Sequence, residues 1–246
     1  MVYPFTIMST RHIAFAIPSL LVVALLALLV HDRTADAADG ETGRIVGVVE
    51  FSGPAPKRPM LARDTDPVCA KTPKASEEVV VTDGRLRDVH VRIKVGTAGT
   101  HEAPERPVRV QQLECMYRPR VVGIVQGQDV VITNGDPTYH NVRAAQNKRT
   151  LWNLSQPASA PALTRKNLGK AGEVVSLHCD VHPWMQAFAV ITDHPFFDVT
   201  ADDGAFAIEG VAPGTYELQS WHPKLGLKTT KVVVEAGKTS KIEFRY

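Results

Sequence analysis

The residues best suited to chemistry lie in one short stretch, which reads Cys-Asp-Val-His-Pro-Trp-Met. It places a thiolate, an imidazole and a thioether at three-residue intervals, at Cys179, His182 and Met185. A second histidine, His140, stands upstream, just after a predicted strand. Two imidazoles, one thiolate and a weak axial thioether can together hold a single copper ion in both of its oxidation states. We therefore predict one mononuclear copper ion bound by these four residues.

Each of these residues also has an ordinary alternative. Cys179 could be a buried thiol, His140 could cap a turn, and Met185 could fill the core. Zinc accepts histidine and cysteine, but a catalytic zinc site rarely includes methionine and usually has a nearby general base. The sequence carries no haem-attachment, thiol-exchange, phosphate-binding or nucleophile-elbow motif. We therefore expect a protein that is not an enzyme.

The N-terminus predicts export. An apolar run from Ile13 to Val30 precedes the small-x-small sequence Ala35-Asp36-Ala37, which is typical of a signal-peptide cleavage site. Residues 1–37 are therefore predicted to be a signal peptide, the alternative being an uncleaved membrane anchor. Either assignment places the rest of the chain in the periplasm or otherwise outside the cytoplasm.

The chain has three cysteines, and in an oxidising compartment two of them are expected to pair. Cys69 and Cys115 lie in loop-like stretches rich in proline and charge, so we predict a disulfide between them. Cys179, between two histidines, is left as the functional thiol.

From Gly43 onward the sequence has the features of β-strands. Between Asp88 and Val95, apolar residues alternate with polar ones, which predicts a strand with one buried face. Gly- and Pro-rich turns separate many such segments, and no amphipathic helix follows the N-terminal segment. The fold class predicted is all-β, with a second, smaller set of strands beginning near Asp193.

The stretch from Cys179 to Met185 resembles the ligand loop of the cupredoxins, the plastocyanin- and amicyanin-like blue-copper proteins. The segment from Asn134 to Val142 is similar to the one that carries their first histidine. The resemblance covers residues 121–192. It implies a Greek-key sandwich, a type 1 copper centre, and a redox partner such as a cytochrome or an oxidoreductase.

Residues 193–246 resemble the small β-sandwich of carboxypeptidase regulatory-like domains, through Gly204-Ala205-Phe206 and Pro213-Gly214-Thr215-Tyr216. Such modules are usually non-catalytic. We expect a copper domain at 43–192, with an N-terminal extension, followed by this module. The stretch Gly43–Val49 also looks like the first strand of that family, so the alternative is that it pairs with the C-terminal module.

A formal net charge of +2 and scattered basic residues give no reason to expect nucleic-acid binding. Membrane association is expected only if the N-terminal segment is retained. Two rival functions are copper delivery without electron transfer and a metal-free structural module of the cell envelope. His194 and His222, each before a proline, are expected to be turn residues, a second metal site being the alternative. Pro183 and Trp184 are expected either to form an apolar lip around His182 or to pack between the two modules.

Overall fold

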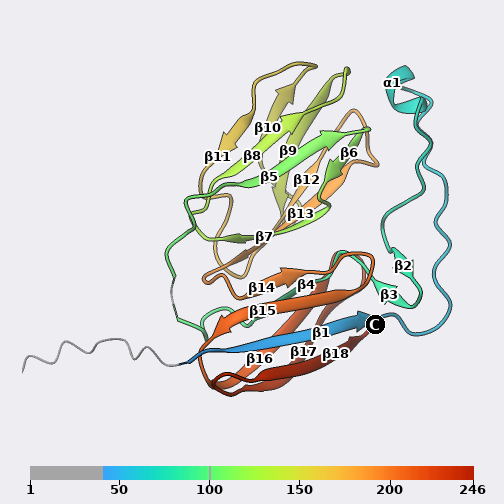
Figure 1. Cartoon of the computed structure of the whole chain (residues 1–246). Helices are drawn as coiled ribbons and strands as arrows, with labels where there is room; N and C mark the ends of the chain where they lie inside the picture. Colours follow the sequence, from blue (N-terminus) through green and yellow to red (C-terminus); the bar gives the residue numbers. More distant parts are fainter. Residues whose placement is uncertain (1–40, 100) are drawn as a thin grey trace, which may run out of the picture. The chain divides into compact units, whose positions relative to one another are not determined.

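The computed structural model describes residues 41–99 and 101–246, and in them it contains strands β1 to β18 and one short helix, α1 (Figure 1). The predicted signal segment, 1–37, lies outside the described residues. Among the residues described, no helix is both long enough and apolar enough to span a bilayer. The expected all-β fold class is confirmed.

Nine consecutive strands form a sandwich that we call the central sandwich. One sheet has the order β10-β9-β12-β13-β7 and the other the order β11-β8-β5-β6. The strands are β5 (Val108–Leu113), β6 (Met116–Arg118), β7 (Val121–Val125), β8 (Val130–Asn134), β9 (His140–Gln146), β10 (Arg149–Gln156), β11 (Leu163–Arg165), β12 (Val174–His178) and β13 (Gln186–Thr192).

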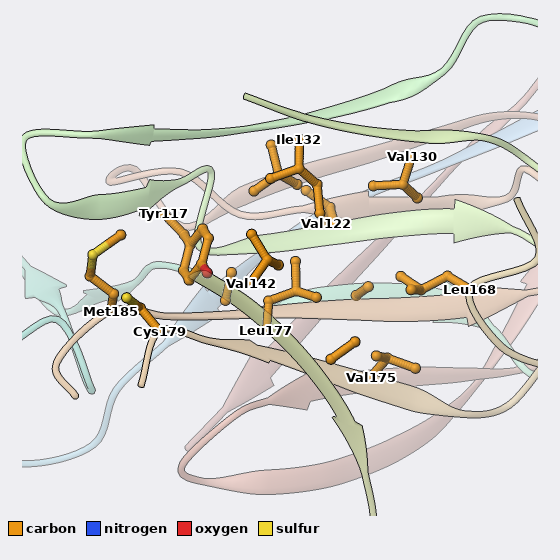
Figure 2. Close-up of a cluster of buried hydrophobic side chains, with 14 of the residues drawn as sticks. Tyr117, Val122, Val130, Ile132, Val142, Leu168, Val175, Leu177, Cys179 and Met185 are labelled. Carbon is orange, nitrogen blue, oxygen red and sulfur yellow. The ribbon is translucent and has the colours of Figure 1, made fainter. Parts of the chain in front are cut away.

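The core of the central sandwich follows from the alternation of its strands. In β12, Val175 and Leu177 are buried while their neighbours are half-buried, as the two-residue period of a strand requires. They pack with Val142 from the same sheet and Ile132 from the facing one (Figure 2). Cys179 and Met185 belong to this same cluster, so the predicted metal loop is continuous with the core.

The remaining strands form a second sandwich, which we call the flanking sandwich. One of its sheets has the order β15-β1-β3-β2 with β18 beside β1, and the other has the order β14-β4-β16-β17. The strands are β1 (Gly43–Glu50), β2 (Val81–Thr82), β3 (Arg85–Leu86), β4 (His90–Ile93), β14 (Phe197–Val199), β15 (Ala205–Val211), β16 (Gly214–His222), β17 (Gly226–Val234) and β18 (Thr239–Arg245).

This strand pairing corrects the expectation that residues from 43 onward extend the copper domain. β1 pairs with β15 and, in parallel, with β18, while β4 pairs with β14 and β16. Ile45 and Val49 of β1 are buried against Phe206 and Phe244 of the flanking sandwich. The alternative pairing, with the C-terminal module, is the one observed, because the apolar face of β1 completes that core.

Between β1 and β2 the chain makes an irregular excursion, residues 52–80, which we call the strap. It contains α1 (Pro67–Ala70), and Figure 1 follows it from the end of β1 through α1 and back to β2. A disulfide joins Cys69 of the strap to Cys115 in the turn between β5 and β6, which confirms the expected pairing. The strap is therefore covalently attached to the central sandwich.

Candidate metal centre

Neighbouring strands bring the two ligand segments together. His140 is the first residue of β9, and Cys179 directly follows β12, which pairs antiparallel with β9 so that His178 lies opposite Arg143. The hydroxyl of Tyr117 donates to the backbone oxygens of Asn141 and His178, at 3.1 and 3.2 Å. This buried phenol links the two strand ends that carry the histidine and the cysteine.

Three of the four predicted ligands converge on one point. The Nδ1 atoms of His140 and His182 are 2.9 Å apart, and Sγ of Cys179 is 3.7 Å from Nδ1 of His182. The donor atoms of all three residues lie within 4.8 Å of one another. Their exposed fractions are 0% for His140, 2% for Cys179 and 1% for His182, so bulk water does not reach the donors.

The outer nitrogen of each imidazole contacts a carboxylate. Nε2 of His140 is 2.9 Å from Oδ2 of Asp136, and Nε2 of His182 is 3.0 Å from Oδ2 of Asp66. An ionised carboxylate can only accept hydrogen bonds, so we assign the ring proton of each neutral histidine to Nε2. When both rings are neutral, each Nδ1 presents a lone pair to the other, and when His140 is protonated its Nδ1–H donates to Nδ1 of His182 at 2.9 Å.

This arrangement fits a bound cation. Two unprotonated Nδ1 atoms 2.9 Å apart repel unless a proton or a metal cation lies between them. Metal–nitrogen and metal–sulfur bonds of about 2.0 to 2.3 Å reach a common point from donors spaced as these are. Thiolate and imidazole together suit copper, and they also accept zinc. The residues present therefore fit the metal that the sequence predicts.

Met185 belongs to the same buried cluster as Cys179. Its exposed fraction is 0%, its backbone N–H donates to the oxygen of His182, and its own oxygen accepts from Cys179. In Figure 2 its thioether lies at the same end of the core as the sulfur of Cys179. The loop thus closes on itself at Met185, while its function as an axial ligand stays a prediction.

The thiol of Cys179 is in an environment that favours the thiolate. Burial raises its pKa, but the neighbouring His140 and the backbone N–H groups of Asn141, His182 and Val181 outweigh burial and hold the pKa below its ordinary value. The side-chain oxygen of Asn141 also accepts from the N–H of Asp180 at 2.7 Å. Because the thiolate is the form that binds metals, this environment prepares Cys179 for coordination.

The two imidazoles differ in their electrostatics. Burial opposes protonation of both, but Asp136 and Cys179 outweigh it at His140 and raise the pKa of that residue. At His182 burial prevails over the contact with Asp66, and the pKa lies below its ordinary value. His182 is therefore neutral at neutral pH, as a metal ligand must be.

Both carboxylates are themselves firmly anchored. Burial opposes ionisation of Asp66, but hydrogen bonds from Thr138 and from the N–H groups of Val68 and Cys69 lower its pKa to about 2. Asp136 accepts from the N–H groups of Glu114 and Cys115, at 2.7 and 2.9 Å. Glu114 and Cys115 both have positive φ, in a two-residue hairpin turn that usually prefers glycine or asparagine.

Sequence reasoning missed both carboxylates. Asp136 stands four residues before His140, and this spacing could have suggested the contact. Asp66 is 116 residues from His182. The only local signal at Asp66 is that of a helix cap before Pro67, which says nothing about a histidine.

The other predicted neighbours of the site are placed as follows. The ring of Trp184 lies 5.1 Å from that of His182, and its Nε1 donates to the oxygen of Cys115 at 3.0 Å. His178, the last residue of β12 and so the residue before Cys179, is half-buried. Trp184 therefore packs against His182 and against the turn that carries Cys115, while the apolar lip itself stays a prediction.

His194 lies in the bend after β13, and His222 is the last residue of β16, directly before a turn. Nδ1 of His194 accepts from the N–H of Phe196, and Nδ1 of His222 accepts from those of Lys224 and Leu225. Within residues 41–99 and 101–246, the groups of side chains spaced for a metal ion include neither histidine.

The family model of polysaccharide lyase family 4, domain II, matches residues 170–242. This match begins just before β12 and ends within β18. The likeness to carboxypeptidase regulatory-like domains stays a prediction. A search of curated proteins finds no relative of the chain.

Solved structures of cupredoxins resemble part of the chain. A reduced Cu(I) form of an amicyanin mutant is 19% identical, with a TM-score of 0.30, over 41% of this chain and 98% of that one. A purple cupredoxin from Nitrosopumilus maritimus is also 19% identical, with a TM-score of 0.28, over 42% of this chain and 97% of that one. We draw nothing about the metal ligands from likenesses of this size.

Proposed function

We propose that this chain is an exported type 1 copper protein that transfers electrons through one mononuclear copper ion. The observation that carries the proposal is the convergence of His140 Nδ1, His182 Nδ1 and Cys179 Sγ in a buried space. Bound copper supplies one-electron chemistry by cycling between Cu(II) and Cu(I). His140, Cys179 and His182 would hold the ion, with Met185 as a weak fourth ligand.

The chain's own residues act by keeping this donor set rigid. Asp66 and Asp136 orient the imidazoles, Asn141 holds the loop at Cys179, and Tyr117 links the two strand ends. A site that keeps its geometry in both oxidation states needs little rearrangement when an electron passes. The chain would therefore act as a carrier and not as an enzyme, with a cytochrome or an oxidoreductase as its partner.

Burial of the donors favours electron transfer over copper delivery. A delivery protein must release its ion to a partner, whereas here the strap covers His182 and is attached through Cys69 and Cys115. Release would require the strap to move away. The disulfide also supports location in the periplasm or another oxidising compartment, because such bonds are rare in the cytosol.

The test is the visible spectrum of the whole chain, produced with its own N-terminal segment in an exporting host and loaded with Cu(II). We expect an intense thiolate-to-copper band that the Cys179→Ser variant lacks. Absence of copper uptake would contradict the proposal. Tight Cu(I) binding without a stable coloured Cu(II) form would indicate delivery, and preference for Zn²⁺ would indicate a zinc site.

A further inference from the structure

The two carboxylates beside the imidazoles share one covalent support. Oδ1 of Asp66 accepts from the N–H groups of Val68 and Cys69, at 2.7 and 3.3 Å. Asp136 accepts from the N–H of Cys115 at 2.9 Å. The backbone N–H of each cysteine in the disulfide thus donates to one carboxylate, and each carboxylate contacts the imidazole of one histidine.

The contact of Asp66 is well defined although Asp66 lies in an irregular segment. Oδ2 of Asp66 accepts hydrogen bonds from Nε2 of His182 at 3.0 Å and from the hydroxyl of Thr138 at 2.8 Å. Both carboxylate oxygens of Asp66 therefore have hydrogen-bond donors. The side chain of Asp66 is 15% exposed and that of Asp136 is 6% exposed. Water therefore screens neither carboxylate fully from the histidine that it contacts.

We propose that Asp66 and Asp136 are positioning residues that favour Cu(II) over Cu(I) and so lower the reduction potential of the centre. This inference rests on the proposed copper function. A carboxylate on the outer nitrogen fixes the ring orientation and makes the imidazole a stronger donor. Two negative charges beside the site also stabilise the ion of higher charge more than the ion of lower charge.

The test compares Asp66→Asn with the matched control Asp64→Asn, using the whole copper-loaded chain. Asp64 is exposed and lies in the strap two residues before Asp66. Loss of such an outer partner typically weakens metal binding about 10- to 100-fold. If only the affinity for Cu(II) falls and that for Cu(I) stays the same, the midpoint potential rises by about 60 to 120 mV. A tenfold change in the ratio of the two affinities corresponds to about 59 mV for one electron. The Asp64→Asn control is expected to keep the wild-type potential.

Several outcomes separate this inference from the proposed function. If wild type lacks the thiolate-to-copper band, the copper function itself fails. If wild type has the band and Asp66→Asn keeps both the band and the potential of Asp64→Asn, the positioning inference is overturned while the copper function stands. Asp136→Asn supplies a second variant, with circular dichroism as a check on folding. It is expected to raise the potential as well, and an unchanged potential in a folded protein would count equally against the inference.

Discussion

Sγ of Cys69 lies 3.7 Å from Nε2 of His182, so the disulfide touches the outer edge of a predicted copper ligand. In sequence these residues are 113 positions apart. The contact exists because the strap crosses the end of the central sandwich at α1 and is held there by Cys115. The strap is thereby part of the environment of the metal centre as well as a connection between strands.

Removing the disulfide is expected to destabilise the chain. The double variant Cys69→Ala with Cys115→Ala leaves no new free thiol and frees a loop that spans 46 residues. Loss of a native disulfide typically costs about 2 to 5 kcal/mol, so the guanidinium unfolding midpoint should fall. Met60→Ala, an exposed change in the same strap, is the control and should shift stability by less than about 0.5 kcal/mol. Equal midpoints for the double variant and wild type would contradict the prediction.

Replacing Met185 with leucine distinguishes an axial ligand from core filler. The two side chains have similar volumes, so the free energy of unfolding of the apoprotein should fall by less than about 1.5 kcal/mol. The thiolate-to-copper band should persist because Cys179 is intact, while the reduction potential should shift because the axial ligand tunes it. Spectroelectrochemistry measures both. An unchanged potential would assign Met185 to the core alone.

Asn141 is expected to support the ligand loop through its side chain. Its oxygen accepts the N–H of Asp180 at 2.7 Å, and its amide donates to Asn153 at 2.7 Å. Asn141→Ala leaves a part-buried N–H without its partner, which should cost about 1 to 3 kcal/mol of folding stability and weaken copper retention.

Asn153→Ala is the matched control for this change. Asn153 is exposed and contacts the same Asp180 and Asn141 from outside. Its removal should cost much less in chemical denaturation and leave copper retention under competing chelator unchanged. Equal effects of the two variants would show that Asn141 acts only through the surface network.

Stability is expected to depend on pH through His222, which lies away from the metal centre. Burial, together with the charge of Arg120, lowers the pKa of His222 from 6.5 to about 4. Between these values the unfolded chain binds a proton that the folded chain does not. Above pH 6.5 the contribution of His222 to the free energy of unfolding is therefore complete. As the pH drops from 6.5 to 4 this free energy falls by about 3 kcal/mol, and below pH 4 it levels off.

The variant His222→Asn provides the measurement. Its oxygen can still accept from the backbone of Lys224 and Leu225, while the titrating group is gone. The stability difference between wild type and variant, from chemical denaturation at pH 7.5 and pH 4.5, should shrink or reverse at the lower pH. A difference that stays constant would sink this assignment.

The sequence alone was sufficient for the all-β fold class and for placing three of the predicted donors in one loop. Alternation of apolar residues reports burial directly, because neighbouring side chains in a strand point to opposite faces. The three-residue spacing of Cys179, His182 and Met185 places the donors in one loop without any long-range contact. The pairing of Cys69 with Cys115 followed from the distinct setting of Cys179.

The tertiary structure decided which distant segments meet. The strap connects β1 and β2, which are both strands of the flanking sandwich. Its residue Asp66 nevertheless contacts His182 of the central sandwich. The pairing of β1 with β15 and β18 was likewise settled by which core its apolar face completes. Local patterns encode which face of a strand is buried and which donors share a loop, but a contact across 116 residues depends on the path of the whole chain.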